Sequence, residues 1–202
     1  MTPRSSVAEA QRTRAAIVER AMEVASIDGL EGMTIGRLAG DLGMSKAGVI
    51  GPFGSKEALQ LATWDAAVEV FRREVWEPAA PCEPGLPRLL AICRAWIAYL
   101  EGEVFPGGCF VCAMAPEFDG RPGPVRDAIA ATQRRWLGVL ASEARVAAKG
   151  GEIDPGRDPD DVAFELNGIA VGLNQSIQLL DDPGAARRAE RAMARALGRE
   201  AL

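Results

Sequence analysis

One short stretch of the chain carries side chains suited to contact with the major groove of DNA. It consists of Ser45, Lys46, Ala47 and Gly48. A lysine ammonium can reach a guanine edge or a phosphate, and an alanine methyl can touch the methyl group of thymine. Small residues also allow the end of a short helix to enter the groove. These four residues are therefore candidate DNA contacts.

Four further candidates lie beside this stretch. Thr34 and Lys56 each fall at a predicted helix N-terminus, where free amide groups and the helix dipole favour a phosphate. Arg37, in the helix that begins near Thr34, and Ile50, at the end of the next helix, complete the predicted set. The expected partner of this surface is double-stranded DNA.

The sequence excludes the commonest catalytic sites. It has no histidine, which rules out Ser-His-Asp and Cys-His catalysis and any zinc site that uses imidazole. It also has no G-x-S-x-G motif and only one tyrosine. We therefore predict that the protein is not an enzyme and that it uses no cofactor and no metal.

Cys109 and Cys112 form a C-x-x-C pair with two possible roles. One is a redox pair, because Cys109 falls near a predicted helix N-terminus, which lowers the pKa of a thiol. The other is core packing, because free cysteines behave as small apolar residues. We favour packing, since the βαβ unit that carries this motif in thiol oxidoreductases is not predicted here.

Charge is unevenly distributed along the chain. The whole sequence carries a net charge of −5, whereas residues 1–60 contain seven basic and seven acidic residues. An acidic body keeps most of the surface away from phosphate, and a neutral head can still bind DNA locally. No apolar run is long enough to cross a bilayer, and the polar N-terminus lacks the apolar core of a signal peptide. We expect a cytoplasmic protein without a membrane partner.

The elements that position these residues are all predicted to be helices, because apolar residues recur with helical spacing throughout. The predicted helices cover 7–27, 34–42, 45–50, 55–76, 86–102, 109–115, 124–149, 159–180 and 184–198. Thr34 and Ser45 suit N-cap positions, and Gly43 suits the turn between their helices. Prolines at 78, 81, 84 and 87 indicate a linker, and 116–124 is a predicted loop. Two helices joined by a short glycine-containing turn form the unit that reads DNA.

Between Gln11 and Leu61 the chain resembles the TetR family of transcriptional regulators. The resemblance rests on Asp28-Gly29-Leu30, Met33-Thr34-Ile35, Leu38-Ala39, Leu42-Gly43-Met44-Ser45, Lys46-Ala47-Gly48 and Phe53-Gly54-Ser55-Lys56-Glu57-Ala58-Leu59. It implies an all-α fold of about nine helices, with a three-helix helix-turn-helix head at 1–58 and a larger ligand-binding and dimerisation body at 59–202. It also implies a homodimer whose body binds a small-molecule effector.

The sequence departs from the family pattern at the end of the reading helix. Ile50 stands where the family usually has a tyrosine whose hydroxyl binds a DNA phosphate, and Pro52 stands where a histidine is frequent. Ile50 cannot make that contact. We favour the interpretation that it packs the head, because losing one phosphate contact weakens binding uniformly without abolishing it.

Large side chains on the body helices are candidates for ligand binding. They are Trp64, Trp96, Tyr99, Phe110, Met114, Trp136 and Phe164. Few acidic residues lie close to them, which favours a neutral or apolar effector. The predicted dimer contacts mix large, small and amide residues along one helix. They are Phe164, Asn167, Gly168, Val171, Gly172, Asn174 and Gln178.

Three functions follow from these observations. The first is a repressor that an effector releases from a pseudo-palindromic operator. The second is a thiol redox regulator that uses Cys109 and Cys112. The third is a helical small-molecule binder, a carrier or enzyme, that has lost DNA binding. We favour the first, because no catalytic group supports the third.

Overall fold

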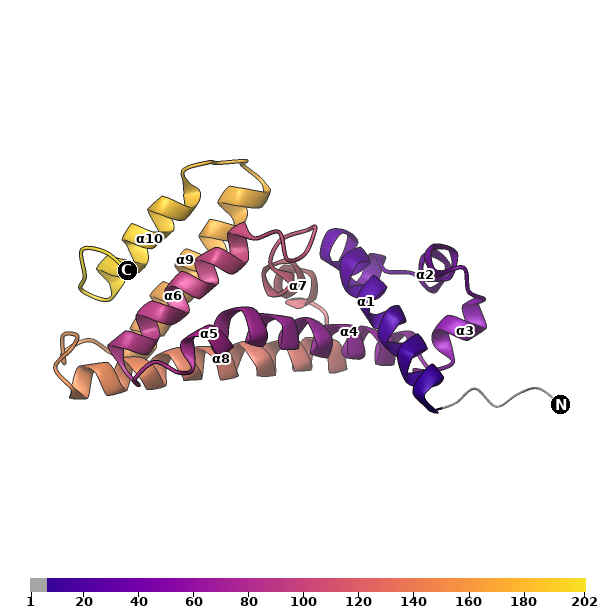
Figure 1. Ribbon diagram of the computed structural model, residues 1–202, viewed down its shortest axis with the longest axis horizontal. Helices are drawn as coiled ribbons and strands as arrows, with labels where there is room; N and C mark the ends of the chain where they lie inside the picture. Colours follow the sequence, from indigo (N-terminus) through magenta and orange to yellow (C-terminus); the bar gives the residue numbers. More distant parts are fainter. Residues whose placement is uncertain (1–6) are drawn as a thin grey trace. The chain divides into compact units, whose positions relative to one another are not determined.

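The computed structural model describes residues 7–202 of the chain, and every regular element among them is a helix. Residues 1–6, which include Arg4 at the start of the predicted domain 1–58, lie outside the described residues. The segments α4, η1 and α5 follow one another without a break (Figure 1). Counted as one, they bring the described residues to nine helices, as predicted. The all-α fold class is confirmed.

The first three helices form the predicted helix-turn-helix head. They are α1 (Val7–Gly32), α2 (Ile35–Leu42) and α3 (Lys46–Ile50). The Thr34 hydroxyl accepts a hydrogen bond from the Arg37 amide, and the Ser45 hydroxyl accepts one from the Gly48 amide. Gly43 has a φ of 63°, in the left-handed region that glycine favours. The local capping rules therefore predicted these boundaries correctly.

The first helix extends beyond its predicted end at residue 27. It continues to Gly32 across a break at Gly29, whose φ is 79° and ψ is 164°. The helical hydrogen bonds resume after this break, because the first amides of the new turn donate to the Glu117 carboxylate. Gly29 therefore bends the helix without ending it.

Two prolines lie inside helices where the sequence predicted a linker and a loop. The helix that begins with α4 (Lys56–Phe71) continues through η1 (Arg72–Trp76) and α5 (Glu77–Ala79), and Pro78 falls in the first turn of α5. Within the continuous helix, Pro78 removes one backbone donor directly after the π-helical segment and two residues before Ala80. Pro116 lies inside α7 (Phe110–Phe118), where it removes a single backbone donor two residues before the helix ends.

The described chain divides into two compact units. Unit 1 contains residues up to Val68 together with Phe105–Ile129, and unit 2 contains Glu69–Val104 and Ala130–Leu202. The remaining helices are α6 (Leu86–Glu101), α8 (Pro124–Lys149), α9 (Pro159–Gln178) and α10 (Ala185–Ala196). Within unit 2, α9 packs against both α6 and α10 (Figure 1). The assignment of DNA binding to 1–58 and ligand binding to 59–202 stays a prediction.

Two further findings concern residues 7–202. None of their helices is both long enough and apolar enough to cross a membrane. Their histidine, cysteine, aspartate and glutamate side chains form no group of three that could hold a metal ion.

Candidate functional site

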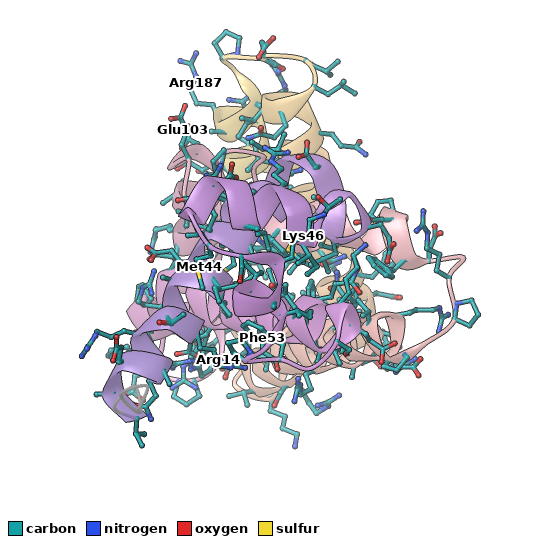
Figure 2. The ribbon with its side chains drawn as sticks, turned by 90° about the vertical axis from the view of Figure 1, so that its right-hand side faces the viewer. Arg14, Met44, Lys46, Phe53, Glu103 and Arg187 are labelled. Carbon is teal, nitrogen blue, oxygen red and sulfur yellow. The ribbon has the colours of Figure 1, made fainter. Side chains whose placement is uncertain are left out.

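The reading helix α3 presents its predicted DNA contacts at the surface. Ser45, Lys46 and Ala47 are exposed, and Gly48 is half-buried against Met44. Lys46 forms no ion pair with any residue between 7 and 202, so its ammonium is available for another partner. Lys46 and Met44 can be followed in Figure 2. This arrangement suits insertion of the helix end into a major groove.

Two arginines of the head, Arg20 and Arg37, are already neutralised by carboxylates. Arg37 pairs with Asp28, and Arg20 bonds Asp41 at 2.8 Å and Glu23 at 2.6 Å. The hydrogen bonds that Arg20 donates to the Glu23 and Asp41 carboxylates raise the pKa of Arg20 above its usual value. Arg37, predicted as a DNA contact, must therefore exchange an internal partner for a phosphate.

Lys56 also has an internal partner. Its ammonium donates to the Glu31 carbonyl oxygen at 2.9 Å and lies 3.4 Å from the Glu31 carboxylate. Gln60 donates to the same carboxylate at 3.0 Å and to the Leu30 carbonyl at 2.9 Å. The hydrogen bond from Gln60, followed by the charge of Lys56, lowers the pKa of Glu31. Lys56 therefore fixes the end of α1, and its predicted phosphate contact remains a prediction.

Arg14 and Phe53 form a contact that the sequence reasoning missed. The Arg14 guanidinium lies over the Phe53 ring, 4.9 Å from its centre. Both residues are labelled in Figure 2. Phe53 follows the reading helix directly, and Ile50 beside it is half-buried, as expected for a residue that packs the head. The sequence gives no signal for this contact, because the two residues lie 39 positions apart and neither specifies the other. Arg14 thus adds an exposed cation to this end of the head.

The end of α1 is fixed by a carboxylate from α7. Glu117 accepts a hydrogen bond from the Leu30 amide at 3.0 Å and another from the Glu31 amide at 2.8 Å. These are the amides that the break at Gly29 leaves without a helical partner. A Cβ atom at Gly29 would lie 2.6 Å from the Glu117 carboxylate, so glycine is required sterically as well.

A second glycine brings the loop before α7 against the same part of α1. A Cβ atom on Gly107 would lie 1.8 Å from the Ser26 carbonyl oxygen, a distance that no side chain permits. The Gly107 amide also donates to the Ser26 hydroxyl at 3.3 Å. We refer to residues 26–31 together with Lys56, Gln60, Gly107 and Glu117 as the α1–α7 joint. It connects α7 to the residues that lead directly into α2.

The predicted ligand-binding residues fall into separate groups. Trp64, Phe110 and Met114 are buried in unit 1, where the Trp64 and Phe110 rings lie 6.2 Å apart. Trp96, Tyr99 and Trp136 lie together in unit 2. Phe164 is 75% exposed on α9, so it lines no interior space of the protomer. Its role as a ligand contact is therefore not supported by its position, because the prediction assumed a buried ring.

Phe71 is the ring that the prediction missed. It contacts all three aromatic residues of unit 2, with ring centres 5.0–5.8 Å apart and planes close to perpendicular. We call Phe71, Trp96, Tyr99 and Trp136 the aromatic cluster. Phe71 lies seven residues after Trp64 in α4. This spacing places both residues on the same face of the helix, and it could have identified Phe71 as a further candidate.

Cys109 is buried, Cys112 is half-buried, and their thiols are in contact. Cys112 shares a side-chain hydrogen bond with Cys109, and this bond together with burial raises the pKa of the Cys112 thiol well above its usual value. Burial likewise raises the pKa of Cys93 to about 12. Thiols rather than thiolates predominate at neutral pH under these conditions, and the thiolate is the reactive form. This environment favours packing over redox chemistry.

The predicted dimer contacts lie mainly on one exposed side of α9. Phe164, Gly168, Gly172 and Gln178 are exposed, whereas Asn167 and Val171 are half-buried. Asn174 is buried inside the protomer at 9% exposure, so it lies on the core side of the helix and not on this stripe. A groove between α9 and α10 continues the stripe and is lined by Phe164, Glu165, Gly168, Ile169, Ala192, Arg195 and Ala196.

Comparison with known proteins gives a consistent result. Residues 85–193, more than half of the chain, match the family described as Tetracyclin repressor-like, C-terminal domain. No curated protein matches the chain.

Several solved structures share the fold. A TetR transcriptional regulator from Chloroflexus aurantiacus has a TM-score of 0.84 at 24% identity, covering 95% of this chain and 96% of its own. A TetR-family regulator from Cytophaga hutchinsonii has a TM-score of 0.82 at 21% identity, covering 97% and 98%. AibR in complex with isovaleryl coenzyme A and operator DNA has a TM-score of 0.71 at 23% identity, covering 87% and 95%.

Proposed function

We propose a specific role for this chain, which belongs to the TetR family of transcriptional regulators: it is a cytoplasmic, homodimeric repressor that leaves a pseudo-palindromic operator when its body binds a small, neutral or apolar effector. The observation that carries the proposal is the exposed end of α3, with Lys46 unpaired among the described residues. Two such ends on a two-fold axis suit half-sites about one helical turn of DNA apart, ~34 Å. The complex of AibR with an acyl coenzyme A and operator DNA supports both binding activities for this fold.

The α1–α7 joint offers a physical route from effector to DNA head. Phe110 and Met114 are buried on α7, the helix that also carries Glu117. A ligand that binds the body with different affinity in two states of α7 shifts the position of Glu117, and only such differential affinity moves the equilibrium. Glu117 in turn bonds the last turn of α1, which leads directly into the helix-turn-helix.

The exposed side of α9 supports dimer formation. Phe164, Leu179 and Leu180 are large apolar residues at 75%, 77% and 66% exposure. Gly168 and Gly172 lie between them and allow a second helix to approach closely. We expect Phe164→Glu to give a monomer in light scattering, whereas Val7→Glu, at an equally exposed apolar residue of α1, leaves the dimer intact.

DNA binding is tested by fluorescence anisotropy with the intergenic DNA upstream of the protein's own gene. At low salt, where phosphate attraction is strongest, we expect binding by the full chain and weaker binding by Lys46→Ala. The control is Lys149→Ala, which removes the same charge from the last residue of α8, outside the head. Absence of binding at low salt, or equal loss in both variants, contradicts the proposal.

A further inference from the structure

The aromatic cluster brings four rings together from three helical segments of unit 2. Phe71, at the end of α4, lies between Trp96 and Tyr99 of α6 and Trp136 of α8. The two indole rings also contact each other, with centres 5.2 Å apart and planes at 84°. Edge-to-face packing of this kind stabilises a cluster without hydrogen bonds.

The two indoles nevertheless carry polar groups without a partner. The Nε1 atoms of Trp96 and Trp136 are buried and have no hydrogen-bond acceptor among residues 7–202. Buried polar side chains elsewhere behave differently: Thr63 donates to the Leu59 carbonyl at 2.8 Å, and Glu143 accepts from the Gly85 amide at 2.8 Å. Buried indole N–H groups usually find an acceptor, so two orphans in one contact point to an acceptor supplied from outside the chain.

A backbone irregularity lies directly beside the central ring. The helix that carries Phe71 changes at Arg72–Trp76 from α-helical to π-helical hydrogen bonding. Such π segments are rare and occur frequently at functional sites. A helix that already departs from regular geometry beside Phe71 provides a place where the backbone can shift, so the ring can move aside without breaking a regular helix.

We propose that the aromatic cluster binds the effector, and that this effector is a neutral molecule whose carbonyl-type oxygen accepts hydrogen bonds from Trp96 and Trp136. This inference rests on the proposed function, because it names the ligand class of the same repressor. A single carbonyl oxygen carries two lone pairs and can satisfy both indoles. Its apolar part packs against Phe71 and Tyr99, with Phe71 displaced at the π segment.

The chemistry of the cluster selects against charged ligands. An indole N–H is a donor only, so an ammonium group leaves both donors unsatisfied. A carboxylate supplies acceptors, but a buried charge requires a paired cation. Of the two arginines adjacent in sequence to cluster residues, Arg72 is already bonded to Glu69 at 2.6 Å and Glu77 at 2.7 Å, and Arg135 is exposed to solvent. A neutral ketone, ester, amide or quinone meets the requirement.

The test uses benzophenone and diphenylmethane, which differ in a carbonyl against a methylene group between the same two rings. Nitrogen–proton NMR spectra of the full chain show one indole resonance for each of its four tryptophans. Trp96→Phe and Trp136→Phe assign two of them. We expect benzophenone to move the proton shifts of both assigned resonances downfield, as hydrogen bonding does. We expect diphenylmethane to cause no such downfield shift.

Affinities supply a second, independent readout. Each Trp→Phe variant should lower the ratio of benzophenone to diphenylmethane affinity about fivefold, the effect of one ordinary hydrogen bond. The ratio cancels the packing that both ligands lose equally. Trp76→Phe, at a tryptophan outside the aromatic cluster whose ring faces Arg88, should leave the ratio unchanged. The spectra of the unaltered chain remain decisive if a variant fails to fold.

The outcomes separate this inference from the repressor proposal. Unchanged Trp96 and Trp136 resonances at saturating benzophenone, or an unchanged affinity ratio in both variants, overturn the ligand class even if the chain binds operator DNA. Displaced resonances in a chain that fails to bind its upstream DNA support the ligand class and refute the repressor.

Discussion

The α1–α7 joint and the aromatic cluster are both close-packed, but they treat their polar groups in opposite ways. In the joint, the Leu30 and Glu31 amides and the Leu30 and Glu31 carbonyls all have partners within the chain. In the aromatic cluster, the Trp96 and Trp136 N–H groups have none among the described residues. A fully bonded site defines one geometry, whereas a site with unmet donors leaves those donors open to an outside acceptor. The joint is therefore suited to transmit a structural change, and the aromatic cluster is suited to bind the proposed ligand.

The largest expected effect comes from the closest contact of the joint. Gly107→Ala places a Cβ atom where the Ser26 carbonyl oxygen lies, so the backbone must shift. We expect the free energy of unfolding to fall by about 2–4 kcal/mol, as for severe overpacking. Urea denaturation measures it. Gly120→Ala, in the same unit and with no atom within 4 Å of a new Cβ, is the control. If Gly107→Ala and Gly120→Ala lower the free energy of unfolding by the same small amount, the backbone of the joint can shift to accept a side chain at Gly107.

The second prediction removes the charge of the joint and keeps its shape. Glu117→Gln replaces one of two carboxylate oxygens with an amide that cannot accept from the Leu30 or Glu31 amide. We expect a loss of about 1–2 kcal/mol, since hydrogen bonds to a charged acceptor exceed neutral ones. Operator affinity should fall as well, because the break at Gly29 is no longer fixed. Asp65→Asn, an exposed acid of α4, removes the same charge and should change neither quantity.

These two predictions concern a part of the molecule that the sequence alone did not reveal. The sequence predicted Thr34 and Ser45 as caps from residue type and position. Each of them bonds an amide only three residues away, so local information was sufficient. Glu117 and Leu30 are 87 positions apart, and nothing in either segment specifies the other. The helix-turn-helix was therefore predictable from local rules, and the joint that holds it was not.

The same distinction applies to the predicted ligand residues. Trp96 and Trp136 were identified as large body residues, but residue type does not show which rings meet or that Phe71 completes the group. Phe164 was expected in a ligand pocket because large apolar residues usually fill cores. It is 75% exposed instead, a position that suits the proposed partner surface.

The third prediction concerns stability in the aromatic cluster. Trp136→Phe removes a buried donor that has no partner, so it loses packing but no hydrogen bond within the chain. We expect the free energy of unfolding to stay within about 1 kcal/mol of the original, because relief of an unsatisfied donor offsets part of the lost contact. Trp64→Phe, at a ring with 1% exposure, should cost more. A larger loss for Trp136→Phe in thermal denaturation would show that its N–H is already bonded.

The smallest expected effect is a dependence of the joint on pH. Gln60 and Lys56 hold the pKa of Glu31 below its ordinary value of 4.5. A carboxylate with a lowered folded-state pKa adds stability that is complete above the unfolded value and disappears as the pH falls through the folded one. The stability difference between the original chain and Glu31→Gln should therefore be constant near neutrality and vanish below the folded pKa. Glu19→Gln, on the exposed side of α1, provides the comparison. A difference that persists in strong acid would mean that Glu31 stabilises the joint through packing, and that charge matters only at Glu117.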